Sequence, residues 1–225
     1  MKPRTDLISS TTLVLLLASA PAAAQTDMIA PDGDAEGLSV FGRVAPLNDA
    51  QTTMQAPHGE VRIAPLGDRL EIAVYARGLE PGMHRTLVHG FADASPREAR
   101  CPTRDADIND DGFVDLAEAR LVAGIALIPL TADTVALRYE SEYFPEAETW
   151  GVADFETRVR IDELAQAVRM RHETPLALET RVVLIHGVAE GTLLPPTVYA
   201  PAGLTPQEAL PVACAELAPS SERLL

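Results

Sequence analysis

Oxygen-bearing side chains recur at alternate positions near the middle of the chain. Residues 107–118 read DINDDGFVDLAE, which matches the D-x-[DN]-x-[DN]-G-x5-E pattern of an EF-hand calcium loop at each specified position. Calcium takes about six to eight hard oxygen ligands, and this spacing brings them to one point, with Gly112 permitting the sharp turn. The predicted ligands include a backbone carbonyl at the seventh position and a side chain that acts directly or through water at the ninth: Asp107, Asn109, Asp111, Phe113, Asp115 and Glu118.

The flanks of this loop differ from those of a paired EF-hand. Pro102 rules out a long entering helix, so only an exiting helix over 116–123 is predicted, and the sequence contains no second loop of this kind. A lone site resembles extracellular calcium modules, with a dissociation constant of ~10⁻⁵ to 10⁻³ M. We expect calcium to act here as a structural staple. The alternative is an Asp-Gly turn that only precedes a helix.

Histidines form a second candidate metal site. His89 lies in HRTLVHGF and His186 in RVVLIHG, each late in a β-type run and each followed by glycine. Together with His84, if it reaches them, they offer two or three imidazoles, which suit copper or zinc. The alternative is that each is a structural histidine with satisfied hydrogen bonds.

The first residues have the layout of a secretory signal peptide. Lys2 and Arg4 precede an apolar run, which is followed by small residues ending at Ala24. The run is too short to span a bilayer as a stable helix, so an uncleaved anchor is the weaker alternative. We predict a signal peptide over 1–24, cleavage near Ala24, export to the periplasm or the extracellular space, and no stable membrane insertion afterwards.

Export affects the interpretation of the two cysteines. Cys101 and Cys214 are an even pair, for which only one intramolecular connectivity exists in an oxidising compartment. The sequence therefore favours a disulfide, and two buried free thiols are the alternative.

The charge balance argues against negatively charged macromolecules and surfaces as partners. The chain has 18 Lys and Arg residues against 33 Asp and Glu residues, with a formal net charge of −15. Nucleic acids and anionic membrane surfaces require a basic footprint, so neither is an expected partner.

Period-two apolar patterns dominate the segments that must position these groups. Many short strands separated by Gly, Pro and Asp clusters favour an antiparallel β-sandwich or barrel. The chain is predicted to form a single domain over 37–218, with a flexible lead-in at 25–36 and a flexible tail at 219–225. Within the domain we expect a calcium-loop insertion at 101–123 and a short helix at 162–171 capped by Asp162. The predicted strands lie at 38–44, 61–64, 69–77, 85–91, 126–130, 135–139, 157–161, 181–186 and 211–217.

Three segments together resemble the copper–zinc superoxide dismutase family. Residues 78–101 (GLEPGMHRTLVHGFADASPREARC) resemble its segment before the loop cysteine, RVVLIHG resembles its V-V-x-H-E strand, and LPVACAEL resembles its C-terminal cysteine strand. Exported bacterial proteins with chordin-type (CHRD) domains share this architecture. The resemblance covers 37–218 and implies a mainly β fold, an antiparallel Greek-key β-sandwich with the EF-hand-like loop and one or two short helices. It also implies a disulfide between Cys101 and Cys214.

The metal-ligand pattern of the resemblance is incomplete. His89 and His186 take two expected copper-ligand positions, but Leu87 replaces the other histidine of the His-x-His pair. The calcium-type loop replaces the stretch that carries the family's zinc ligands. Pro211 stands where the family has an arginine that guides the anionic substrate. A dismutase needs several imidazoles and a positive field, so these departures argue against dismutase activity.

Two functions remain in view. The first is an exported, non-catalytic, dismutase-like domain in which calcium stabilises a long disulfide-tethered loop. The second is a copper- or zinc-binding redox protein that keeps a degenerate site from His84, His89 and His186. Beyond calcium, the sequence identifies no protein partner.

Overall fold

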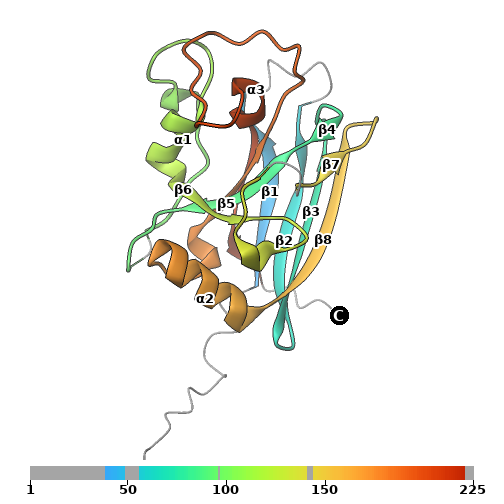
Figure 1. The fold of residues 1–225 in the computed structure, drawn as a ribbon, viewed down its shortest axis with the longest axis vertical. Helices are drawn as coiled ribbons and strands as arrows, with labels where there is room; N and C mark the ends of the chain where they lie inside the picture. Colours follow the sequence, from blue (N-terminus) through green and yellow to red (C-terminus); the bar gives the residue numbers. More distant parts are fainter. Residues whose placement is uncertain (1–38, 49–55, 96, 141–143, 221–225) are drawn as a thin grey trace, which may run out of the picture. The chain divides into compact units, whose positions relative to one another are not determined.

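The computed structural model describes residues 39–48, 56–95, 97–140 and 144–220. The predicted signal peptide and lead-in lie outside these ranges. Within them, the fold is mainly β, with a curled antiparallel sheet and three short helices (Figure 1). The helices are α1 (Leu116–Ala123), α2 (Ile161–His172) and α3 (Pro206–Ala209). None of the described helices has the length and apolar character needed to cross a membrane.

The large sheet of the described chain has nine strands in the order β6-β5-β9-β10-β1-β2-β3-β8, with β11 also pairing with β1. Its strands are β1 (Val40–Pro46), β2 (His58–Leu66), β3 (Arg69–Arg77), β5 (Arg85–Gly90), β6 (Ile125–Pro129), β8 (Val152–Arg160), β9 (Val182–His186), β10 (Pro211–Glu216) and β11 (Ala218–Pro219). A separate pair consists of β4 (Gly82–Met83) and β7 (Glu146–Ala147). Pro219, at the start of the predicted tail, pairs with Val40.

Strand β1 joins two sections of this sheet. Its residues 40–44 pair with β2, whereas Ala45 and Pro46 pair with Cys214 and Ala213 of β10. Apolar side chains from both sections, such as Ile63 on β2 and Ile185 on β9, belong to one core cluster. The curl of the sheet therefore encloses the main core.

The alternation predicted for residues 69–77 is confirmed. Leu70, Ile72, Val74 and Ala76 are buried in β3, and the residues between them are at least partly exposed. Strand β9 differs because all five of its residues are buried. Its alternate apolar side chains face the main core on one side and a second cluster with α1 on the other, and its one polar residue, His186, is buried as well.

One predicted strand is wrong. The alternation of Val135, Leu137 and Tyr139 indicates a strand, but residues 134–136 form a 3-10 turn. Leu137 has a left-handed backbone with φ of 47° and its N–H donates to Thr134 O. These apolar residues instead line a cleft. A cleft wall, like the buried face of a sheet, favours apolar side chains at alternate positions.

The predicted short helix at 162–171 exists as α2, but its cap is wrong. The N-cap is Arg160, and Ile161 N donates to Asp68 O. The Asp162 carboxylate binds the Arg160 guanidinium instead of capping the helix from outside. The third helix, α3, exceeds the one or two predicted; Thr205 and Glu208 form a capping box at its start.

Candidate functional site

The loop at 107–118 is organised by hydrogen bonds from its own backbone. The Asp107 carboxylate accepts from Asp111 N at 3.2 Å and from Gly112 N at 2.9 Å. Asn109 Oδ1 accepts from Asp111 N at 2.9 Å. Gly112 has φ of 90°, a left-handed conformation that favours glycine, so the turn at the sixth loop position has the required residue.

The second half of the loop is part of a helix cap. Asp115 Oδ1 accepts from Ala117 N and Glu118 N, while Glu118 Oε2 accepts from Asp115 N. This capping box starts α1. The other Glu118 oxygen accepts from Ile108 N at 2.8 Å. Glu118 therefore ties the exiting helix to the start of the loop, and both its carboxylate and that of Asp115 are buried.

The donor set of this loop suits a hard cation, because it consists of carboxylate, amide and carbonyl oxygens. Among the described residues, no three His, Cys, Asp or Glu side chains are grouped as they would be around a metal ion. The loop carboxylates accept backbone hydrogen bonds instead. A calcium ion would draw them towards a common point and compete with these bonds.

Two outside segments hold the loop against the sheet. Val114 N donates to Asn48 Oδ1, and Asn48 Nδ2 donates to Val114 O and Pro211 O. On the other side, Thr197 Oγ1 donates to Asp111 Oδ2 and Tyr199 N donates to Asp115 Oδ2. Val114 itself is buried in the second cluster, which also includes residues of α1 and β9.

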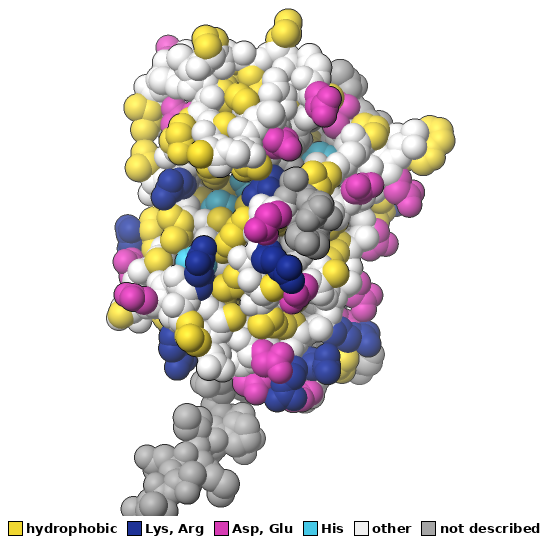
Figure 2. Space-filling model, viewed as in Figure 1, with side chains coloured by type: hydrophobic (Ala, Val, Ile, Leu, Met, Phe, Trp, Pro, Cys, Tyr) yellow, Lys and Arg dark blue, Asp and Glu magenta, His cyan; other side chains and the backbone are white. Residues whose placement is uncertain are grey.

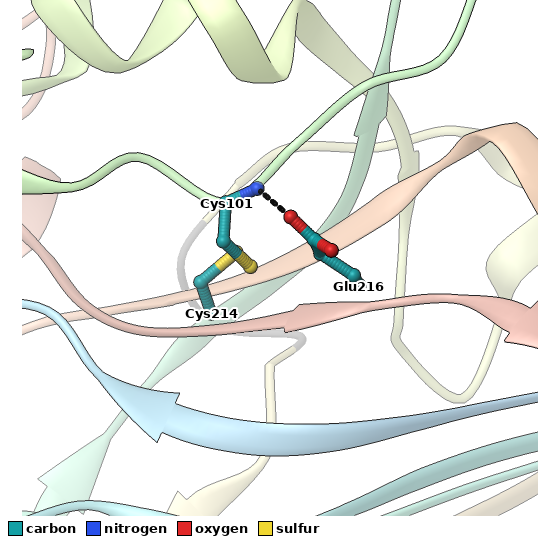
Figure 3. Close-up of a disulfide and its surroundings, with 3 residues drawn as sticks. All are labelled: Cys101, Cys214 and Glu216. Carbon is teal, nitrogen blue, oxygen red and sulfur yellow. Dashed lines mark hydrogen bonds between the residues drawn. A yellow bond between two sulfur atoms is a disulfide. The ribbon is translucent and has the colours of Figure 1, made fainter.

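The predicted disulfide between Cys101 and Cys214 is present (Figure 3). It joins residues 113 positions apart and connects the segment before the loop to β10. Cys101 N also donates to Glu216 Oε1 at 2.8 Å, so backbone and side chain are held at the same place. A disulfide indicates a non-reducing environment.

The two strand histidines come together. His89 on β5 and His186 on β9 have ring centroids 5.6 Å apart, and both are buried. Nδ1 of His186 lies 2.8 Å from Arg85 O, and Nδ1 of His89 lies 3.4 Å from Gly124 O. A carbonyl only accepts, so each Nδ1 carries the proton. Each Nε2 is then a buried lone pair, and neither has a hydrogen-bond partner.

Gly124 permits this arrangement next to His89. Its φ is 77°, and a Cβ there would lie 2.1 Å from Gly90 O. Only glycine lets the end of α1 approach β5 this closely.

His84 does not share this arrangement. Its Nε2 lies 2.7 Å from Glu80 O and its Nδ1 lies 3.0 Å from His186 O. Both nitrogens therefore face backbone carbonyls, and His84 offers no free lone pair beside His89 and His186.

Burial keeps the histidine pair neutral. Burial, reinforced by the neighbouring His186, lowers the pKa of His89 to about 3. Burial, reinforced by the positive charge of Arg85, lowers the pKa of His186 to about 4. Burial also lowers the pKa of His84.

The histidine pair lies at the wall of a cleft of about 1080 Å³. Figure 2 shows histidine side chains in a hollow flanked by arginines. Arg85 comes from β5, Arg120 from α1 and Arg171 from α2. These arginines are far apart along the chain and no local spacing connects them, so the sequence alone does not identify the group.

Comparison with known proteins gives no assignment. No protein-family model matches this chain, and a search of curated proteins finds no significant match. Function is therefore inferred from the chemistry of the loop and the cleft.

Proposed function

We propose that this chain is an exported, non-catalytic calcium-binding protein. Calcium at 107–118 stabilises a long loop that the disulfide tethers. The loop lies on a Greek-key sandwich of the copper–zinc superoxide dismutase type. The single observation that carries the calcium site is the complete twelve-position pattern with its loop geometry: Gly112 has a positive φ, and the Asp107 carboxylate lies inside the turn. These features are typical of EF-hand loops.

The surroundings support a structural role for the ion. The loop contacts Asn48 beyond β1, Thr197 and Tyr199 in a distant segment, and follows the disulfide at Cys101. An ion that fixes the loop would thereby fix the ends of several segments at once. Export is supported by the disulfide and by the predicted signal peptide.

Some features support the dismutase-type architecture. His89 and His186 lie on adjacent antiparallel strands, with His89 opposite Val182 and His186 opposite Arg85. The disulfide joins a loop to the C-terminal strand β10. Both features agree with the resemblance, whereas the missing imidazoles argue for a non-catalytic member.

The test is calcium-dependent thermal unfolding of the disulfide-bonded protein after treatment with a chelator. At a calcium concentration of 100 times the dissociation constant, the ion should stabilise the fold by about 2.7 kcal/mol. That corresponds to a rise in melting temperature of about 5–10 °C for a chain of this size. Magnesium at the same concentration should have a much smaller effect, because it demands shorter, near-octahedral coordination.

Three isosteric variants make this test specific. Asp107→Asn and Glu118→Gln each remove a ligand charge and should abolish most of the calcium-dependent rise. Asp110→Asn removes a charge from the same loop at a position the pattern does not use, and its φ of 57° suits asparagine. The Asp110→Asn variant should retain the calcium-dependent rise in melting temperature. An equal calcium response in all three variants, or none in the parent protein, would rule out the site.

A second candidate function, copper or zinc binding, is favoured by the unpartnered Nε2 atoms of His89 and His186. Two neutral imidazoles with engaged Nδ1–H groups have the tautomer that a metal ligand requires. Arg85 and Arg120 in the same cleft oppose a cation. Metal analysis of protein purified from its native compartment distinguishes the candidates: copper or zinc that is lost in His89→Gln supports this function, and calcium alone rules it out.

A further inference from the structure

The arginine-lined cleft has a charge opposite to that of the chain. Among the described residues, its walls contain Arg85, Arg120, Arg171 and Arg138, of which Arg138 pairs with Asp133, against one acidic residue, Glu140. The whole chain has an excess of acidic residues, with a formal net charge of −15. A local excess of arginine therefore reduces the repulsion that an anion meets at this hollow (Figure 2).

Arg85 is the most unusual of these residues. It is only 7% exposed, and its Nη1 atom is buried without a hydrogen-bond partner. Its guanidinium lies 4.9 Å from the centroid of the Phe144 ring, and it forms no ion pair with any described carboxylate. A buried guanidinium without an acceptor is costly, so a native structure that keeps one calls for an explanation.

Nearby carboxylates do not supply that acceptor. Glu208 uses its carboxylate in the capping box of α3, where it accepts from Thr205. Glu140 is exposed at the wall of the cleft. Both act on Arg85 only through space, and burial lowers its pKa despite them. Arg85 therefore lines the cleft with its Nη1 atom unpaired, and no described carboxylate supplies the acceptor.

Aliphatic side chains form much of the remaining wall. Leu87 of β5, Ile125 of β6, Leu137 after the 3-10 turn, Ala167 of α2 and Leu204 before α3 all line the cleft. Small-molecule sites commonly combine such walls with a few placed polar groups in a volume of about 300–1,000 Å³. At about 1080 Å³, this cleft lies just above that range.

We infer that the cleft binds a small organic carboxylate, with the acid group at Arg85 and the apolar body against the surrounding aliphatic side chains. The planar guanidinium matches a carboxylate in two-point geometry, and the rim arginines Arg120 and Arg171 add attraction. A bare inorganic anion would leave the apolar walls unused. The inference is independent of calcium, because none of the predicted calcium ligands lines the cleft.

The test is calorimetric titration with sodium octanoate as the probe and octanamide as its neutral counterpart. All titrations are made with EDTA present, so neither calcium nor copper or zinc contributes. We expect one-to-one octanoate binding that weakens with added NaCl, and at least about tenfold weaker binding of octanamide, as expected for loss of a charged hydrogen bond. Inorganic phosphate at the same concentration should not displace octanoate.

Variants locate the site. Arg85→Gln should weaken octanoate binding by about tenfold or more. Arg97→Gln is the matched control, because Arg97 also lies over an aromatic ring, that of Phe91, but does not line the cleft. It should bind octanoate like the parent protein. If Arg85→Gln does not fold, as judged by circular dichroism, the Arg120→Gln/Arg171→Gln double variant decides, with an expected loss of about threefold or more.

Several results would overturn the inference: no octanoate binding at millimolar concentration, equal binding of octanoate and octanamide, or displacement by phosphate. An unchanged octanoate affinity in a folded Arg85→Gln protein would also overturn it. If Arg85→Gln does not fold, an unchanged octanoate affinity in the Arg120→Gln/Arg171→Gln double variant would overturn it. A failed calcium titration would leave all of these outcomes unaffected.

Discussion

His89 and His186 show how one residue type can couple the core to pH. Both are neutral in the folded protein, because burial lowers the pKa of His89 to about 3 and that of His186 to about 4. In the unfolded chain a histidine has a pKa of about 6.5. Between these values the unfolded chain binds more protons than the folded one. The free energy of unfolding must therefore fall as the pH falls through this window.

The pair should account for about 3–4 kcal/mol of stability lost between pH 7 and pH 5 in metal-free protein. Denaturant unfolding at several pH values measures this slope. In the double variant His89→Gln/His186→Gln the decline over this window should be clearly shallower, because neither side chain can take up a proton on unfolding.

His58 provides the matched control for this slope. It lies exposed at the start of β2, so His58→Gln should keep the parent pH dependence. If the double variant declines as steeply as the parent between pH 7 and pH 5, the histidine pair is not the source of the effect.

Individual residues could be predicted from the sequence only where their neighbours in the chain identify them. The candidate ligands of the loop and both strand histidines stand out through spacing. Arg181 does not: it is 1% exposed, and its guanidinium donates to Phe91 O, Leu176 O, Thr174 Oγ1 and Pro175 O. Nothing in RVVLIHG distinguishes such an arginine from a surface one. The sequence does not distinguish Arg85 either, because the Phe144 ring beside its guanidinium comes from a distant segment.

At the scale of elements, the loop depends on Asn48 for its attachment to the sheet. The Asn48 side chain both donates to and accepts from Val114, and it also donates to Pro211 O in β10. Its φ of 59° is one that asparagine tolerates better than most residues. One amide group thus joins the loop, the end of β1 and β10.

Replacement of this amide should detach the loop. Asn48→Asp keeps the backbone preference but places a carboxylate against two carbonyl oxygens, so we expect a loss of about 2–4 kcal/mol in the free energy of unfolding. Asn48→Ala should cost about 1–3 kcal/mol, because it leaves the partners unpaired without adding a charge. Urea unfolding at pH 7 compares the three proteins. An Asn48→Asp protein as stable as the parent would show that the loop does not depend on this contact.

Local patterns predicted most elements because the signals for them are local. Alternation in 69–77 and the oxygen-rich turn before α1 both specify structure within a few residues. The segment at 135–139 was mispredicted because a cleft wall excludes water from alternate side chains as a sheet does, while Leu137 adopts a left-handed turn. The start of α2 differs from the prediction because Ile161 N donates to the distant Asp68 O, while the Asp162 carboxylate binds the neighbouring Arg160 side chain instead of capping the helix.

At the scale of the whole molecule, strand order is the property least accessible from sequence. Strand β1 pairs with β2 along most of its length and with β10 only at Ala45 and Pro46. No pattern within β1 specifies that division, which follows from how both sheet sections close around one core. The disulfide stabilises this closure, because Cys214 lies opposite Ala45 where the sections meet.

Removal of the disulfide should therefore destabilise the entire fold. A bridge across 113 positions stabilises by about 4–5 kcal/mol when it restricts the unfolded chain. The double variant Cys101→Ala/Cys214→Ala should lose about this amount in urea unfolding, and reduction of the parent protein should give the same loss.

The variant should nevertheless keep the calcium-dependent stabilisation that we propose for the parent protein. Each predicted ligand lies within 107–118, and the hydrogen bonds that shape the loop arise mainly within it, so the bridge restricts the chain without building the site. Calcium titration of the alanine variant separates the two effects. If the calcium-dependent rise in melting temperature disappears together with the bridge, the loop is shaped by its tether at Cys101. If the rise persists while overall stability falls, the loop is a self-contained unit attached to a sheet that the disulfide holds closed.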